Sequence, residues 1–463
     1  MPSLNSAAAQ SPFTDKMLDD FRKHGDPLAD EVIEAFATQH GSSIKELTDK
    51  LQDIARMPVR DEMHDVIHEH FPHDAVVCDA LEKYFTHASL VPEWADPEKL
   101  KLGGHVFQDH MFSGFMMLAC SSLPNCYACQ PDVKVLSFTR RLVDNAPKRI
   151  VETAQMVTDV MGDGGLSIKN GHVTGKGIQS ILKVRLLHAC VRYLLLNKEQ
   201  LTTKHCDEND INPDNFFSAY IHDAVQANCK WHGEQKPTPW DVKNDGTPLN
   251  AEVLAGVLLT FSYSILRGLK TIGVKLNARQ QNAYLHSWNV AGHALGVEEK
   301  FLAEYDTYEK AEVIYNQILQ RRRGKTEDGM LLQQALLDAF SLAASKVIPF
   351  PLDKILHIKR MPRLITSILI SKKSFAALGL KLSIYDYFIR IFVWLLLKLF
   401  GFFVNLGFLR VFADVMFKYL AKTLWGWRED YPDAKHETVK GGKPLSIPHK
   451  LVATSYLSGK YKS

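Results

Sequence analysis

Apolar residues recur every three to four positions along most of the chain, which is the period of an amphipathic helix. Alternating apolar and polar runs, typical of strands, are rare. The pattern predicts short helices within residues 21–85, and longer ones over residues 107–119, 133–141, 148–161, 183–196, 215–227, 251–272, 278–294 and 297–322. We therefore predict an all-α fold.

Stretches rich in glycine and proline predict the breaks between these helices. The stretch PEWADPEKLKLGGHVF, residues 92–107, is expected to be a loop punctuated by Gly103 and Gly104. The stretch GDGGLSIKNGHVTGKG, residues 162–177, holds many turn-forming residues and is expected to form a small hairpin. No internal repeat is found.

The pattern changes after Lys346, where prolines and basic residues precede a very apolar stretch at residues 391–412. A membrane-spanning helix needs about 20 mostly apolar residues. This stretch has that length but contains Lys398, Asn405 and Arg410. Because lysine and arginine side chains can snorkel, a helix lying on a membrane surface fits better than a span. Burial against the main domain is the alternative.

Composition and charge restrict the class of protein. The chain has 463 residues, 46% of them hydrophobic, which is enough for a large core. Its net charge is only +3 and no basic stripe is present, so nucleic acid is not an expected partner. The amino terminus shows no secretory signal, and the seven cysteines are an odd number. Reduced thiols and a cytoplasmic location, with a possible membrane association, are expected.

The segment KVRLLHACVRYLLL, residues 183–196, places one histidine in an apolar helix. Arg185 and Arg192 lie three residues before and four residues after His188, so the three side chains share one face. Burying two cations without anionic partners is expensive. A haem would meet both needs, because its iron accepts an imidazole nitrogen and its propionates pair with arginine. A structural histidine bonded to backbone is the alternative.

The segment PKRIVETAQMVTDVMG contains a second candidate group. Arg149 and Thr153 are four residues apart and Glu152 lies beside them, so the trio shares a helical face. Opposite a metal, an arginine can stabilise charge, a hydroxyl can hydrogen-bond a ligand and a carboxylate can move protons. An ordinary surface pair with a neighbouring threonine is the simpler interpretation.

Other motifs carry weaker signals. His64 and His68 are spaced to grip zinc, but no HExxH pattern accompanies them and a charged helix face is expected. A single CxxC, formed by Cys126 and Cys129, is weak evidence for a metal or redox site. His286 and His293 are seven residues apart, about two turns, on one helical face, and core packing is expected for Trp288, Gly292 and Gly296.

Five segments occur in an order that resembles a known family. They are SSLPNCYACQPDVKVLSFTRRL, KRIVETAQMVTDVM, KVRLLHACVRYLL, PWDVKNDGTPLNAEVLAGVLLTFSYSILRGL and AYLHSWNVAGHALGV. Together they resemble the catalytic domain shared by rubber oxygenase (latex-clearing protein) and the endoplasmic-reticulum-bound oxygenase of mycophenolic acid biosynthesis. The resemblance covers roughly residues 107–315.

The resemblance implies a globin-like helical core that binds haem b. It implies that His188 is the proximal ligand of the iron and that Arg149 and Thr153 are distal residues. Rubber oxygenase has a lysine immediately before that threonine, whereas this chain has Glu152. The departure makes rubber an unexpected substrate and leaves the distal side of the haem undefined.

The resemblance also implies an oxygenase that uses O2 on a hydrophobic, prenyl-like or lipid substrate with a carbon–carbon double bond. Glu152 would remove an allylic proton, and Arg149 and Thr153 would stabilise the reacting oxygen or position the substrate. An apolar pocket or plain core is expected from four side chains: Phe112, Phe115, Met116 and Met117. The alternatives are a haem-binding sensor or electron carrier without catalysis, and a helical membrane-associated scaffold without haem.

These expectations divide the chain into three regions. Residues 1–106 form an N-terminal helical region, and residues 107–346 form the haem-binding core. Residues 347–463 form an apolar and basic region suited to peripheral membrane contact.

Overall fold

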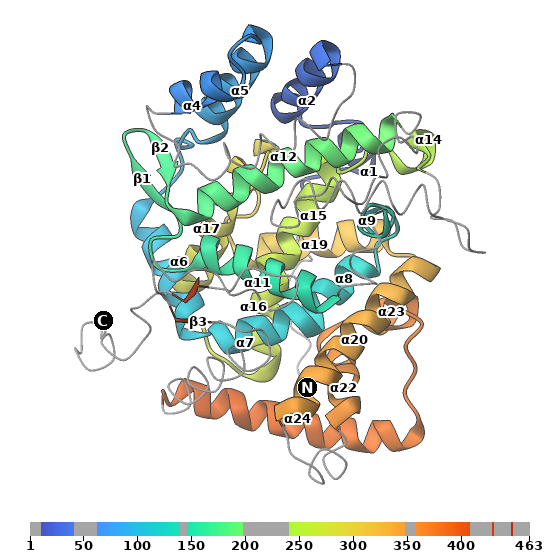
Figure 1. Cartoon of the computed structure of the whole chain (residues 1–463). Coiled ribbons are helices and arrows are strands. Elements are labelled where there is room, and N and C mark those ends of the chain that lie inside the picture. Colours follow the sequence, from blue (N-terminus) through green and yellow to red (C-terminus); the bar gives the residue numbers. More distant parts are fainter. Residues whose placement is uncertain are drawn as a thin grey trace.

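The structure is a computed structural model in which residues 11–40, 63–138, 146–197, 240–347 and 358–407 are described, with two short strands beyond them. Helices dominate these segments, so the predicted all-α class is confirmed (Figure 1). The helix predicted over residues 215–227 lies outside the described residues.

Helices of the N-terminal half are short and closely spaced. They are α1 (Asp15–Phe21), α2 (Pro27–His40), α4 (Met63–His70), α5 (Ala75–Ala88), α6 (Pro97–Asp109), α7 (Met111–Met117), the π-helix η1 (Leu118–Ser122), α8 (Leu123–Tyr127) and α9 (Gln130–Ser137). Met117 is fully buried, and Phe112, Phe115 and Met116 are half-buried against the core.

Helix α6 corrects the predicted loop at residues 92–107. Asp96 caps its N-terminus and Pro97 stands in the first turn, both favourable positions. The two glycines serve close helix packing rather than a turn. A Cβ at Gly103 would lie 2.6 Å from the Ala283 carbonyl oxygen of α17 (Ala278–Ala294), so only glycine fits this contact.

The middle of the chain forms a helical hairpin around a two-stranded sheet. Helix α11 (Ala146–Met161) leads into β1 (Ser167–Lys169) and β2 (His172–Thr174), which pair antiparallel with Ile168 opposite Val173. The predicted hairpin is therefore confirmed. Helix α12 (Lys176–Leu196) follows and crosses the molecule in contact with α2, α11 and α17 (Figure 1).

The predicted helix over residues 251–272 is two helices, α15 (Ala251–Phe261) and α16 (Tyr263–Ile272). The Ser262 hydroxyl donates to the Leu258 carbonyl at 2.9 Å where they meet. The remaining elements are α14 (Val242–Asp245), α18 (Glu299–Leu302), α19 (Tyr308–Arg322), α20 (Glu327–Val347), the 3₁₀-helix η5 (Ile358–Arg360), α22 (Met361–Leu369), α23 (Lys372–Ala377) and α24 (Ile384–Asn405). Strands β3 (Arg428–Glu429) and β4 (Ser446–Ile447) pair in parallel.

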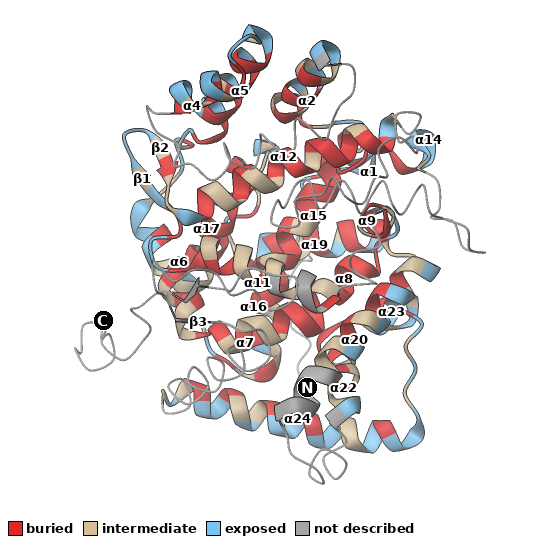
Figure 2. Cartoon of the chain, in the orientation of Figure 1, coloured by how far each residue is buried: buried red, intermediate tan, exposed pale blue. Residues whose placement is uncertain are grey.

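One large hydrophobic cluster runs from Phe13 to Val404 and joins most of these helices. Burial is concentrated on α12, α15 and α17, whereas α24 lies across one end with much of its surface exposed (Figure 2). The boundaries predicted at residues 106 and 346 stay predictions, since buried side chains on both sides of each share this cluster.

Candidate functional site

The hairpin of α11 and α12 determines how far along its helix each predicted site residue lies from the two β strands. Near the β strands, the Ser180 hydroxyl donates to the Asp159 carboxylate at 2.7 Å. Both helices rise about 1.5 Å per residue and run in opposite directions. His188 lies eight residues beyond Ser180, and Glu152 and Thr153 lie seven and six residues before Asp159, so all three lie about two turns along their helices from this contact.

The side chain of His188 lacks a described partner. Its Nδ1 atom is buried and has no hydrogen-bond partner among the described residues. Burial, together with the positive charge of Arg192, lowers the pKa of His188 to about 4. The imidazole is therefore neutral at pH 7, which is the form that coordinates a metal. The residue still keeps intermediate accessibility, unlike Leu187 and Ala189 beside it.

Arg185 is paired with a carboxylate far away in the sequence. Its Nε donates to Asp26 Oδ2 at 2.6 Å and its Nη2 donates to Asp26 Oδ1 at 2.8 Å. Its Nη1 donates to the Ala294 carbonyl at 2.9 Å, and both charged residues are buried. Gly296 has φ +87°, and a Cβ there would lie 2.9 Å from the Arg185 guanidinium carbon.

Arg192 has a similar set of acceptors. Its Nη1 is bonded to Asp30, and its Nε donates to the Pro248 carbonyl at 2.9 Å. Both arginines of α12 are therefore paired with carboxylates of the protein itself, Arg185 with Asp26 and Arg192 with Asp30. The propionate contact predicted for Arg185 and Arg192 is not among the described interactions and stays a prediction.

Asp26 and Asp30 are the residues that sequence reasoning missed. They stand at the start of α2, four residues apart, on one helical face. Two acids one turn apart match two arginines two turns apart on another helix only through the reach of the long arginine side chains. That match was the available signal, although it does not identify which acids in the chain are the partners.

The predicted distal residues come from α11. Glu152 and Thr153 are half-buried, and Arg149 lies one turn before Thr153 on the same helix. The side chain of Arg149 lies outside the described part of the structure. The structure thus brings Glu152 and Thr153 to the helix pair that carries His188, and their catalytic roles stay predictions.

The two histidines of α17, His286 and His293, have partners within the protein. His286 Nε2 accepts from the Asp96 backbone N–H at 2.9 Å, and burial lowers its pKa to about 4. His293 is bonded to Glu299 and to the Leu90 carbonyl. Gly292 allows α15 to approach, since a Cβ there would meet Leu258 Cδ2 at 2.5 Å. The packing role expected for Gly292 fits this contact.

Cys126 and Cys129 are buried neutral thiols. Cys126 Sγ lies 3.3 Å from the Thr260 hydroxyl, and Cys129 Sγ donates to the Asn125 carbonyl at 3.3 Å. Burial raises the pKa of Cys126 to about 12 and moves that of Cys129 upward as well. Thiols held protonated in this way are poor nucleophiles and poor metal ligands.

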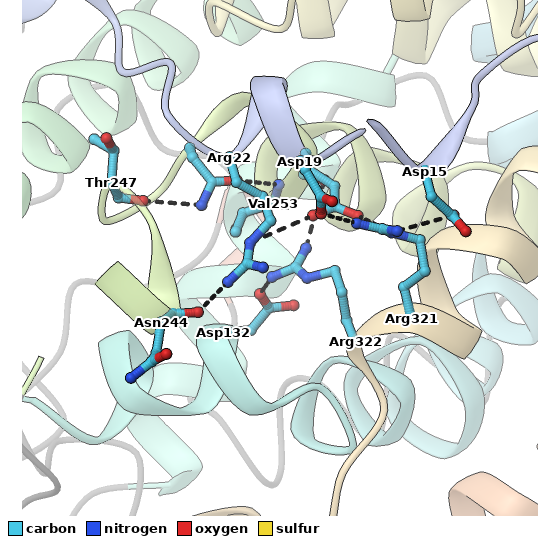
Figure 3. Close-up of polar contacts among 11 residues, drawn as sticks. Asp15, Asp19, Arg22, Asp132, Asn244, Thr247, Val253, Arg321 and Arg322 are labelled. Carbon is cyan, nitrogen blue, oxygen red and sulfur yellow. Dashed lines mark hydrogen bonds and ion pairs between the residues drawn. The ribbon is translucent and has the colours of Figure 1, made fainter. Parts of the chain in front are cut away.

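A second group of charged side chains, some buried and some exposed, ties α19 to three other helices (Figure 3). Arg322 is bonded to Asp132 of α9, and Arg321 contacts Glu252 of α15 at 3.1 Å. Arg321 also reaches Asp15 at 2.8 Å and Asp19 at 2.5 Å, both on α1. These charges satisfy one another, so the cluster holds helices together and needs no ligand.

The fold and the unpartnered histidine of α12 define an all-helical protein with a candidate metal-binding centre. Comparisons with known proteins indicate which family of helical proteins the chain resembles. Residues 220–396 match the family described as ER-bound oxygenase mpaB/B'/Rubber oxygenase, catalytic domain. The resemblance inferred from the sequence motifs is thereby confirmed. The matched range begins after His188 and does not itself test the site residues.

Two individual proteins are similar to this chain. The rubber oxygenase of Streptomyces sp. (strain K30) is 23% identical over 260 residues, which are 56% of this chain. The match spans 52% of that relative, about half its length. A solved structure of latex clearing protein in the closed state superposes with a TM-score of 0.58 at 17% identity. It covers 89% of this chain and 94% of the other, so the two share a fold.

Proposed function

We propose that this protein is a haem b-dependent oxygenase that acts on a hydrophobic unsaturated substrate, prenyl-like or lipid. The observation that carries the proposal is the neutral, unpartnered imidazole of His188 in the middle of α12. The relatives named as oxygenases support the class of reaction.

One observation indicates that the residues present fit a haem. A buried polar atom without a partner is costly, by about 1–3 kcal/mol, so an unpaired imidazole inside a protein calls for an explanation. Coordination of iron by His188 would give the ring a partner that the described residues do not supply, and would account for its intermediate accessibility. When bound, haem would supply the activation of O2.

Residues of α11 would act on the substrate. Glu152 would accept a proton from the allylic carbon of the substrate, because a carboxylate near a reacting C–H is a general base. The Thr153 hydroxyl would donate a hydrogen bond that positions the substrate or the reacting oxygen. Arg149, at the same face of the helix, would stabilise developing negative charge.

Helix α24 supports contact with a membrane, where such substrates dissolve. The 18 most apolar consecutive residues of this helix have a mean hydropathy of 2.0, and only 22% of that stretch is buried. Its buried side, including Val393, Leu397 and Gly401, packs on the helical bundle. Its other side exposes large apolar side chains: Ile384, Tyr385, Tyr387, Phe388, Ile391, Phe392, Trp394, Leu395, Leu396, Leu399, Phe402, Phe403 and Leu406.

The orientation of α24 favours a position in the plane of the membrane. Asn405 accepts from the Lys275 N–H at 2.9 Å and donates to the Gly273 carbonyl at 2.8 Å, which fixes the end of α24 to the bundle. At its start, Asp386 pairs with Arg360 at 2.9 Å and with Arg363 at 3.2 Å. A helix fixed along its length with one apolar side outward can lie in an interface.

The oxygenase proposal is tested by O2 uptake of the haem-loaded protein with unsaturated apolar lipids. We expect consumption of O2 that requires the substrate, together with oxygenated products detected by mass spectrometry. Glu152→Gln should lower the rate on the order of 100-fold, since general base catalysis contributes about that much. Haem binding without substrate-dependent O2 uptake would instead support a haem-binding sensor or electron carrier. This is the second candidate function, because Glu152 replaces the lysine of rubber oxygenase.

The membrane contact is tested by flotation of the full chain with phospholipid vesicles. Phe388 and Phe392 are 70% and 57% exposed. Each buried phenylalanine contributes about 1.5–3 kcal/mol, so Phe388→Glu with Phe392→Glu should weaken vesicle binding at least about 10-fold. Val76→Glu, on the exposed side of α5, is the matched control and should bind like the wild type. Equal flotation of the double variant, or no flotation of the wild type, would refute the contact.

A further inference from the structure

Three potential metal ligands converge between α4 and α5, outside the site described above. His64 and His68 lie one turn apart on α4, and their ring centroids are 4.3 Å apart. Glu82 comes from α5, and its Oε1 lies 2.5 Å from His64 Nδ1 and 3.0 Å from His68 Nε2. All three ligand atoms lie within 4.8 Å of one another.

Packing of the two helices holds this group in place. On α4, Met63 and Ile67 are buried, so the opposite side carrying His64 and His68 faces outward. On α5, Leu81 is fully buried beside Glu82 in the sequence. The turn between the helices is tied by the Cys78 thiol, which donates to the Phe71 carbonyl at 3.3 Å.

The donor set identifies the class of ligand. Two imidazole nitrogens and one carboxylate oxygen suit zinc and its neighbours among the transition metals, whereas calcium and magnesium prefer oxygen ligands alone. Spacing of two histidines by four residues lets both rings reach one ion from one helical face. Three protein ligands leave a fourth position open to water.

We propose that His64, His68 and Glu82 form a binding site for a divalent transition metal ion, with zinc as the ion of choice. The side chains of His64, His68 and Glu82 are 63%, 44% and 33% exposed, so an ion can enter from solvent. Bound metal would join α4 to α5 by a link that the apolar contacts alone do not provide. The proposal is independent of haem and of catalysis.

The test uses the full chain without added haem. Cobalt(II) added to the purified protein should give visible absorption bands typical of a low-coordinate protein site, and zinc should remove them by competition. Zinc should also raise the melting temperature, because a ligand that binds only the folded state stabilises it. Absence of both effects in the wild type would overturn the proposal.

Variants distinguish zinc binding at this site from unspecific zinc binding by other histidines. His64→Ala and Glu82→Gln should each weaken zinc binding at least about 10-fold, since even outer-shell changes often have that effect. His70→Ala is the matched control, because it removes a histidine of the same helix that is not part of the group. Equal affinity in all four proteins, or an equal loss in His70→Ala, would overturn the proposal. Circular dichroism of each variant verifies that the helices are retained.

Discussion

His188→Ala is expected to abolish stable haem binding. The variant removes the one side chain of α12 whose buried ring nitrogen lacks a described partner. The apoprotein would be mixed with haemin and passed through a gel-filtration column. Its visible absorption spectrum would then be recorded for the oxidised and the reduced form. The wild type should retain a Soret band, and the variant should lose it or show a strongly altered one.

The matched control for this experiment is His286→Gln. His286 is a buried histidine that, like His188, has a pKa near 4, but its Nε2 accepts a hydrogen bond from Asp96. Glutamine can keep that acceptor, so this variant should bind haem like the wild type. Added imidazole should restore part of the Soret band in His188→Ala if the ring is a ligand. An unchanged spectrum of His188→Ala would contradict the assignment, and a wild type that takes up no haemin would favour the scaffold.

Asp26→Ala is expected to lower the free energy of unfolding by about 3–5 kcal/mol. The substitution leaves Arg185 buried and charged without its carboxylate partner, and an uncompensated buried charge costs that much. Urea unfolding followed by circular dichroism would measure the change. Asp20→Ala is the control, because Asp20 is exposed and its pair with Lys23 at 2.8 Å lies in solvent.

The double variant Asp26→Ala with Arg185→Met separates an ion pair from general packing. Removing both charges should recover much of the stability lost in the single variant, because a buried pair replaced by apolar groups is often nearly neutral. Stability changes that simply add would show that the two residues do not interact. A loss below about 1 kcal/mol in Asp26→Ala, the range of exposed pairs, would contradict the buried pairing.

Much of the candidate site follows from local sequence. The helical period places Arg185, His188 and Arg192 on one face of α12, and the turn residues of 162–177 predict the hairpin that returns α12 along α11. Asp26, the partner of Arg185, lies 159 residues away along the chain. The sequence shows that two cations need acids, but it holds 52 aspartates and glutamates and does not single out Asp26.

The sequence by itself determined the helical class, the hairpin, the histidine-bearing helix and the apolar stretch of α24, because these depend on the spacing of residues within one element. The tertiary structure alone decided which elements meet. It turned the expected loop at Gly103 and Gly104 into a helix closely packed on α17, brought Glu82 to His64 and His68, and left one side of α24 uncovered. Periodicity reports the face of each helix, whereas pairing depends on the packing of surfaces that lie far apart in the chain.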